Sequence, residues 1–303
     1  MRYLLLILAA GLVGCQSDTT EAPPETTQTV PAPMEQAAES ISLAALLDAQ
    51  PDEVKARYQY RNPEQTLEFV GIEPGMTVLE GLPGGGWYTK LLLQYLGSDG
   101  TVLVANYNLD LYPLFGFMNE ERLAEMAVWQ ENWQESSADW GGENGASTAA
   151  YHFGSIPEDR AGTVDVVFFP RVLHNLARFQ KAGNGDFLDE ALADVYNVLK
   201  PGGVFGVVQH RAPDDKSDDW ADGSRGYLKQ SFVIEQAEKA GFEFVGSSDI
   251  NLNPNDQPGE NDIVWRLPPS LVTSREDEAL RAQMLAIGES SRMTLKFVKP
   301  AAE

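Results

Sequence analysis

Three histidines, His152, His174 and His210, are the side chains of this sequence best suited to proton transfer. His174 follows the apolar run 164–169, and His210 comes just after the apolar run 204–208. If both runs are strands of an open α/β sheet, their carboxyl ends border the same ligand crevice. We therefore expect His174 and His210 to reach a ligand there and to accept a proton from it as catalytic residues. Structural hydrogen bonds at the sheet edge are the alternative for both, and the expected role of His152.

Other charged side chains offer two further kinds of site. Two histidines with Asp165 or Asp249 could bind a metal, but the sequence lacks the spacing of metal ligands, so we expect none. Arg211 and Arg292 could bind an anionic substrate, with salt bridges at the surface as their alternative role.

A glycine-rich turn, residues 80–86, is the second candidate site, and we call it the glycine turn. It follows the strand pattern 77–80 and leads into a helical pattern from about Trp87 to Leu96. Glycines let a backbone approach a ligand closely and adopt angles that other residues avoid. The start of the helix then offers free N–H groups and a positive dipole end to an anionic group. A tight strand-to-helix connection that binds nothing is the alternative, so the context of the turn carries most of its meaning.

Strand and helix patterns alternate along the chain and would position these residues. We expect strands at 77–80, 101–106, 151–153, 164–169, 204–208, 243–246 and 293–298. We expect helices at 43–48, from Pro63 onward, and at 87–96, 120–133, 187–199, 231–240 and 276–287. This alternation predicts an α/β fold with a mostly parallel sheet and helices on both faces. Residues 250–290 interrupt it, and we expect this insertion to form a lid or substrate wall.

The chain from about Arg61 to Pro300 resembles the class I S-adenosylmethionine-dependent methyltransferases, in particular a group of predicted, often exported members. The resemblance rests on residues 61–63, Glu80 with 83–89, His174-Asn175, Lys200-Pro201-Gly202-Gly203, His210-Arg211, 265–269 and 292–297. It implies a Rossmann-like sheet of seven strands, one of them antiparallel, with S-adenosyl-L-methionine over the carboxyl ends. The cofactor-binding residues it implies are Glu80, Pro83, Gly84, Gly85, Gly86 and Trp87, with Asn106 as a partial substitute for an acidic residue.

Two positions depart from the family pattern. Leu82 stands where the turn usually has glycine, and the second strand ends at Asn106 where the family has an acid that binds the ribose hydroxyls. A hydrogen bond to a charged group contributes roughly 1.5–3 kcal/mol, so its loss would weaken cofactor binding about ten- to a hundredfold. Asn106 or Asn108 could replace the acid in part, or Asp110 could reach back.

A methyltransferase acting on a small molecule or an envelope component is thus the predicted function. A non-catalytic ligand-binding module that retained the fold is the alternative, because S-adenosylmethionine is a cytoplasmic metabolite and the chain carries an export signal. A hydrolase is not supported, since the sequence has no nucleophile elbow.

The first fifteen residues resemble a bacterial lipoprotein signal peptide. Arg2 precedes an apolar run that is too short to span a membrane, and the run ends in Leu12-Val13-Gly14-Cys15. The resemblance implies removal of residues 1–14 and lipidation of Cys15, the sole cysteine, so the chain forms no internal disulfide. Gln16 in place of aspartate slightly favours the outer membrane, with the protein facing the periplasm.

Composition sets the remaining expectations. Residues 15–40 are rich in Thr, Glu, Pro and Ala and predict a disordered tether, followed by a methyltransferase-like domain at 41–303. A formal net charge of −23 argues against binding to nucleic acid or to an anionic membrane surface. The expected contacts are therefore a small-molecule ligand and a membrane reached through the lipid alone.

Overall fold

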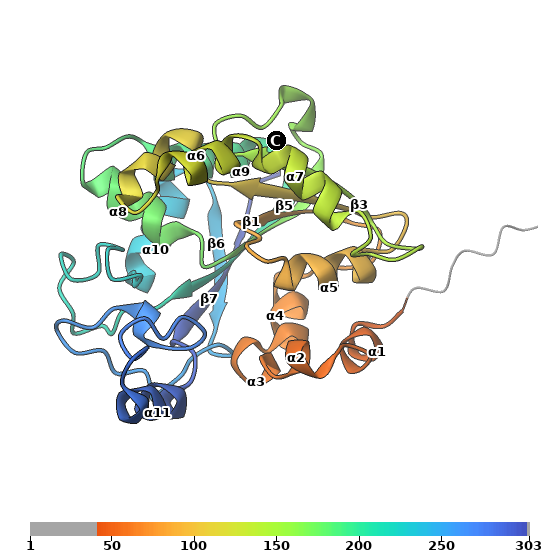
Figure 1. Cartoon of the computed structure of the whole chain (residues 1–303). Coiled ribbons are helices and arrows are strands. Elements are labelled where there is room, and N and C mark those ends of the chain that lie inside the picture. The colour runs from red at the N-terminus through yellow and green to blue at the C-terminus, as the bar shows by residue number, and fades with distance from the viewer. Residues whose placement is uncertain (1–40, 302–303) are drawn as a thin grey trace, which may run out of the picture. The chain divides into compact units, whose positions relative to one another are not determined.

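The computed structural model describes residues 41–301, and a seven-stranded sheet lies at their centre (Figure 1). The strands are β1 (Thr77–Gly81), β2 (Thr101–Asn106), β3 (Ser147–His152), β4 (Val164–Pro170), β5 (Leu199–His210), β6 (Glu243–Ser248) and β7 (Arg292–Val298). Their order is β3-β2-β1-β4-β5-β7-β6. Strands β1 to β5 pair in parallel, whereas β7 runs antiparallel to both β5 and β6. The prediction of a Rossmann-like class I methyltransferase fold, with one antiparallel strand, is confirmed.

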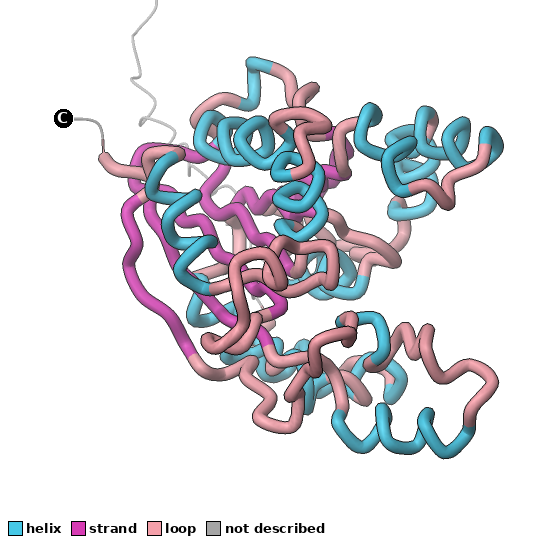
Figure 2. Tube along the Cα trace, turned by 90° about the vertical axis from the view of Figure 1, so that its left-hand side faces the viewer, coloured by secondary structure: helices cyan, strands magenta, loops and turns pink. Residues whose placement is uncertain are grey.

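Helices cover both faces of this sheet (Figures 1 and 2). The α-helices are α1 (Leu43–Asp48), α2 (Asp52–Lys55), α3 (Tyr58–Arg61), α4 (Pro63–Val70), α5 (Trp87–Leu96), α6 (Glu120–Ala127), α7 (Trp129–Ser137), α8 (Leu173–Lys181), α9 (Phe187–Val198), α10 (Gln230–Lys239) and α11 (Glu278–Ile287). Three short 3-10 helices are η1 (Leu109–Phe115), η2 (Glu158–Arg160) and η3 (Val264–Arg266).

The core is split into two layers because side chains alternate along each strand. On one face Val78 and Phe168 pack with Leu67 of α4 and Leu92 of α5. On the other face, neighbouring strand residues pack with the apolar sides of α8, α9 and α10. Both layers are mainly apolar, as expected for parallel strands buried on two sides.

Several elements match the sequence-based expectation and others correct it. Helix α5 and strand β2 begin and end as predicted. The predicted helix 120–133 is two helices, because Val128 leaves the helical region at φ −108° and ψ 13°. Strand β3 starts at Ser147 rather than Tyr151, since pairing with β2 extends it over small and polar residues.

Two further corrections concern the segments next to the histidines. Helix α8 was not predicted; it follows β4 directly and carries His174. Strand β5 is longer than the predicted 204–208 and reaches from Leu199 to His210.

The insertion after β6 holds η3 and α11, connected by loops. Within residues 41–301, no helix combines the length and the apolar character needed to cross a bilayer. The predicted signal peptide, Cys15 and the tether lie outside the described residues.

Candidate functional site

The glycine turn has a left-handed backbone at residue 82, which is leucine where the resemblance predicts glycine. Leu82 lies at φ +50°, and Gly84 and Gly86 lie at φ +55° and +75°. A residue with a Cβ costs roughly 1–2 kcal/mol in this conformation. The Leu82 amide donates to the Ala105 carbonyl oxygen at 2.7 Å, which fixes the turn against the end of β2. Residue 82 is thus leucine where the resemblance predicts glycine, yet it adopts the left-handed conformation that glycine favours.

Open space lies beside two of the three consecutive glycines. A Cβ added to Gly84 or Gly85 would meet nothing within 4 Å. A Cβ on Gly86 would lie 2.2 Å from the Trp140 ring, so packing alone requires that glycine. No side chain caps the start of α5, which leaves its first N–H groups free for an anionic group.

Glu80 lies beneath the turn rather than in open space. It is 1% exposed, and its Oε2 accepts a hydrogen bond from Thr89 Oγ1 at 2.5 Å. Burial raises the pKa of the Glu80 carboxyl to about 7. Glu80 thus joins β1 to α5 directly. The next predicted residue, Trp87, packs under the Arg61 guanidinium, 4.3 Å from the ring centroid.

The end of β2 offers an amide in place of the missing acid. Asn106 Oδ1 accepts from the Tyr107 amide at 2.9 Å, and its Nδ2 has no hydrogen-bond partner in the described chain. Asn108 is already engaged, because its Nδ2 donates to Glu190 at 2.9 Å. Asp110 is exposed on η1. Of the three residues considered as substitutes, Asn106 is therefore the one with a free donor.

A cavity of about 210 Å³ lies at the carboxyl ends of β1, β4 and β5, and we call it the histidine pocket. Leu82, His174 and His210 all line it, so the structure brings both predicted catalytic residues together with the glycine turn. Pro83, Asn106 and the three consecutive glycines are not part of its lining. The insertion supplies much of the opposite side through Val264, Trp265, Leu267, Pro268, Pro269 and Ser270.

The two histidines of the pocket are neutral and lie close together. Their ring centroids are 5.6 Å apart. Burial lowers the pKa of His174 to about 4 and that of His210 well below its usual value. His210 Nδ1 is hydrogen-bonded to Ser290 Oγ at 2.6 Å, which leaves Nε2 available to a ligand. Neutral imidazoles of this kind can accept a hydrogen bond from a ligand, but their lowered pKa makes them weaker bases than an ordinary histidine.

His174, like His210, has one ring nitrogen in a hydrogen bond. Asn175 Nδ2 donates to His174 Nε2 at 3.1 Å, whereas His174 Nδ1 has no partner among residues 41–301. His152 lies outside the pocket lining, and its Nδ1 is hydrogen-bonded to the Tyr107 carbonyl at 2.7 Å. The structure thus gives His152 a structural contact.

Arg171, which the sequence analysis missed, also lines the histidine pocket. It directly follows β4 and lies at φ +71°, a costly conformation for a residue with a side chain. Burial lowers its pKa to about 10, so it stays charged at neutral pH. A lone cation immediately after the buried apolar run 164–170 was the available signal.

The two arginines proposed from the sequence have different surroundings. Arg211 pairs with the exposed Asp214 at 3.2 Å, which agrees with a surface salt bridge. Arg292 is 3% exposed and pairs with the buried Glu289 at 3.2 Å, so its expected surface role is wrong. No group of three or more metal-type ligands is arranged for a metal ion among residues 41–301.

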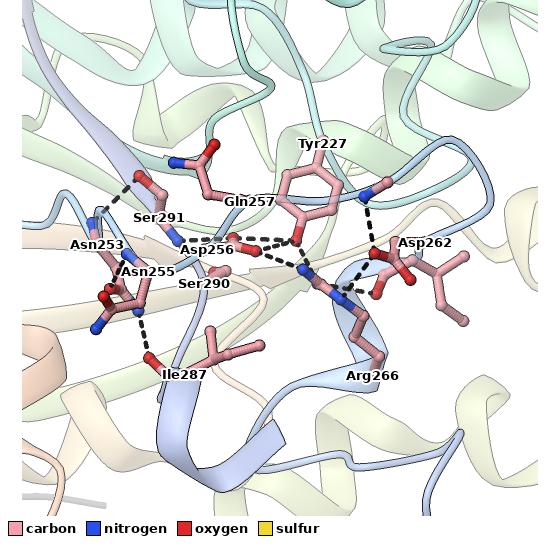
Figure 3. A network of polar contacts seen from close by, with 12 residues as sticks. Tyr227, Asn253, Asn255, Asp256, Gln257, Asp262, Arg266, Ile287, Ser290 and Ser291 are labelled. Atoms are coloured by element: carbon pink, nitrogen blue, oxygen red, sulfur yellow. Dashed lines mark hydrogen bonds and ion pairs between the residues drawn. The ribbon is translucent and has the colours of Figure 1, made fainter. Parts of the chain in front are cut away.

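A buried polar network fixes the insertion beside the pocket (Figure 3). Asp256 accepts from Arg266 Nη2 at 2.8 Å and from the Tyr227 hydroxyl at 3.0 Å. It also accepts from the Ser291 amide at 2.9 Å. The insertion is thereby tied to the segment after β5 and to the start of β7, and its pocket-lining residues have a fixed base.

The sequence matches none of the known protein-family profiles. It is similar to the ubiquinone/menaquinone biosynthesis C-methyltransferase UbiE of Legionella pneumophila, with 25% identity over 148 residues. The match covers 49% of this chain and 48% of that protein, so the chain spans about half the length of the relative it matches.

Solved structures with a similar fold include two named methyltransferases. A SAM-dependent methyltransferase from Aquifex aeolicus is 17% identical, with 82% of this chain and 98% of that chain covered and a TM-score of 0.48. An arsenic(III) S-adenosylmethionine methyltransferase from Chlamydomonas reinhardtii is 17% identical, with 88% and 75% covered and a TM-score of 0.43.

Proposed function

We propose that this chain is an S-adenosylmethionine-dependent methyltransferase that acts on a small molecule or an envelope component. The observation that carries the proposal is the left-handed backbone of the glycine turn at Leu82, beside open space at Gly84 and Gly85. Backbone strain of this kind persists where the surrounding structure enforces it, and it clusters at ligand sites. The similarity to UbiE over part of the chain supports the same assignment.

The residues around the turn fit the cofactor. Pro83, Gly84 and Gly85 would lie along the methionine part of the molecule, and the free N–H groups of α5 would bind its carboxylate. Asn106 Nδ2 would donate to the ribose hydroxyls. Three further residues would support this surface through their own contacts: Glu80 with Thr89, Gly86 with Trp140, and Trp87 with Arg61.

The pocket histidines would serve the methyl acceptor. When bound, S-adenosylmethionine would supply its methyl group to a nucleophilic atom of the acceptor, and S-adenosylhomocysteine would be the leaving group. Methyl transfer depends largely on positioning, so the main task of His174 is to shape the pocket. His210 Nε2 would accept a hydrogen bond from the methyl acceptor, because its ring is neutral at neutral pH, but its lowered pKa makes it a weak base for removing a proton.

Calorimetry of the purified whole chain with S-adenosylmethionine and S-adenosylhomocysteine tests the proposal. We expect dissociation constants on the order of tens to hundreds of micromolar, because no acid ends β2. Gly84→Val should abolish binding, since its side chain would occupy the open space.

Gly162→Val is the matched control for that variant. Gly162 lies at φ +65° with nothing within 4 Å of an added Cβ. It precedes β4, however, and so lies at the amino end of that strand, away from the carboxyl ends that border the pocket. It should carry a similar backbone cost and leave binding intact. Failure of the well-folded protein to bind either compound at millimolar concentration would contradict the proposal and favour a non-catalytic binding module.

We further propose that the protein is anchored in the cell envelope by lipid on Cys15 and faces the periplasm, with the outer membrane slightly favoured. The support is the sequence Leu12-Val13-Gly14-Cys15 after a short apolar run. More than one acyl chain gives stable anchoring. Cys15→Ser should release the protein from membranes or leave the precursor uncleaved. An unmodified Cys15 in the mass spectrum of the mature protein would refute the anchor.

A further inference from the structure

Positive charge gathers beside the histidine pocket although the chain as a whole carries a formal net charge of −23. Arg57, Arg61, Arg171 and Arg292 form what we call the arginine cluster. Burial, and then the charge of Arg171, lower the pKa of Arg61 to about 9, so these guanidinium groups interact with one another. Like charges held together in a buried region are costly unless anions compensate them.

One carboxylate, Glu289, compensates three members of the cluster. Its oxygens lie 2.5 Å from Arg57, 3.2 Å from Arg292 and 3.9 Å from Arg61. Burial raises the pKa of Glu289, but the three arginines outweigh burial and lower it overall, so Glu289 is ionised. Glu80 adds little compensation, because burial raises its pKa to about 7.

Arg171 is the member of the cluster left without a partner. Its guanidinium makes no hydrogen bond or ion pair with any residue of 41–301, although it borders the same cavity as Glu289. Its backbone is fixed by the hydrogen bond from its amide to the Val208 carbonyl at 2.6 Å. A guanidinium without a hydrogen-bond or ion-pair partner, carried on a fixed backbone at the edge of a cavity, is suited to bidentate contact with a planar anion.

The rest of the lining indicates the size and polarity of a ligand that would fit the cavity. Val264, Trp265, Leu267, Pro268 and Pro269 give the cavity an apolar side, and its volume of about 210 Å³ is small. His174 and His210 are neutral and add no second positive charge. The pocket therefore matches a small molecule with one negative charge and an apolar body.

We infer that the methyl acceptor is a small carboxylic acid whose carboxylate binds Arg171 and whose apolar body lies against Trp265 and the adjoining prolines. The identification of this ligand as the methyl acceptor rests on the proposed function. The carboxylate site itself rests on the geometry of the pocket alone. A carboxylate is favoured over a phosphate because Arg171 supplies the cavity with a single guanidinium that lacks a direct partner. Under the proposed function, the cofactor's own carboxylate would bind elsewhere, at the uncapped start of α5.

Calorimetry of the whole chain with benzoate as the probe tests this site, in the presence and absence of S-adenosylhomocysteine. Benzoate should bind with a dissociation constant of about a millimolar, and the uncharged isostere benzamide should bind at least about tenfold more weakly. Arg171→Gln should weaken benzoate binding by about tenfold or more, and Arg171→Lys by less, because lysine keeps the charge and loses the fork.

Arg122→Gln is the matched control, since Arg122 is exposed on α6 and its removal changes the net charge equally. It should leave benzoate binding unchanged, and none of these variants should alter S-adenosylhomocysteine binding or the thermal midpoint appreciably. Equal binding of benzoate to Arg171→Gln, or no benzoate binding by the wild type at about 10 mM, would overturn the inference.

Competition between benzoate and S-adenosylhomocysteine would overturn it too, because Arg171 would then hold the cofactor's carboxylate. Tighter binding of phenyl phosphate than of benzoate would overturn the assignment to carboxylic acids. If the wild type binds benzoate but not S-adenosylhomocysteine, the proposed methyltransferase is refuted and the carboxylate site remains in place.

Discussion

The glycine turn and the histidine pocket meet at Leu82 but are built in opposite ways. The turn is one continuous segment, and what it offers a ligand is backbone and empty space. The pocket draws its lining from the ends of β4 and β5, from the insertion and from the segment before β7, and it depends on buried charge. A local segment can keep its shape through backbone conformation alone, whereas a site assembled from distant segments needs a network that fixes each one.

Asp256→Ala should produce the largest effect and should separate the two regions. Asp256 is 0% exposed at its side chain, and its removal leaves the guanidinium of Arg266 and the Tyr227 hydroxyl buried without their acceptor. Breaking a buried ion pair in this way costs about 3–5 kcal/mol of unfolding free energy. Denaturant unfolding measures that loss. Benzoate binding should fall with it, while S-adenosylhomocysteine binding to the remaining folded protein should persist.

Asp262→Ala provides the comparison, because Asp262 also contacts Arg266, at 3.4 Å, but is 43% exposed at its side chain. An exposed partner of this kind contributes at most about 1 kcal/mol. Equal losses from the two variants would show that the network does not hold the insertion in the way described.

Glu80→Gln should have the next largest effect, visible as a change in the pH dependence of stability. The carboxyl ionises near pH 4.5 when unfolded, but burial raises its pKa to about 7 in the folded protein. Between these values the folded state binds more protons than the unfolded state, so stability falls as pH rises through this range. The full loss is up to about 3 kcal/mol and is present above pH 7.

The variant should therefore match the wild type near pH 4.5 and exceed it in stability above pH 7. His174 adds the opposite trend to both proteins, because its lowered pKa of about 4 makes stability fall as pH drops below 6.5. Unfolding free energies of the two proteins across this range give the difference directly. Glu121→Gln, which removes an exposed carboxylate, should show no such difference. A constant difference at every pH would contradict the role of burial.

The same contrast explains how much could be predicted from the sequence. Helix α5 and strand β2 were predicted with close to their observed bounds, because glycines and apolar runs mark their ends locally. The break at Val128 could not be seen, since helix-forming residues lie on both sides of it. Strand β3 was predicted too short, because its first residues become a strand only by pairing with β2.

The site follows the same rule. The glycine turn and the two pocket histidines were found because each lies at the end of a strand that the sequence itself marks. The pairing of Glu289 with Arg57 was missed, because the two residues lie 232 positions apart and meet only in the folded chain. Arg171 was missed for a different reason: its lack of a partner is a property of its folded surroundings.

Leu82→Gly should have the smallest effect, and it tests whether the turn or the side chain sets the backbone at the border of the two regions. Glycine removes the left-handed penalty of roughly 1–2 kcal/mol. It also loses the apolar contacts of the half-buried leucine and gains about 0.5–1 kcal/mol of chain entropy in the unfolded state. These terms nearly cancel, so the unfolding free energy should change by less than about 1 kcal/mol.

Leu82→Val keeps part of the apolar contact but places a β-branched residue at φ +50°, so it should be clearly less stable than Leu82→Gly. If the turn is held by the amide of residue 82 and by its glycines, S-adenosylhomocysteine should bind Leu82→Gly within about threefold of the wild type, while benzoate binding changes because the pocket gains space. A large loss of S-adenosylhomocysteine affinity in Leu82→Gly, measured by calorimetry on folded protein, would mean instead that the leucine side chain holds the turn open.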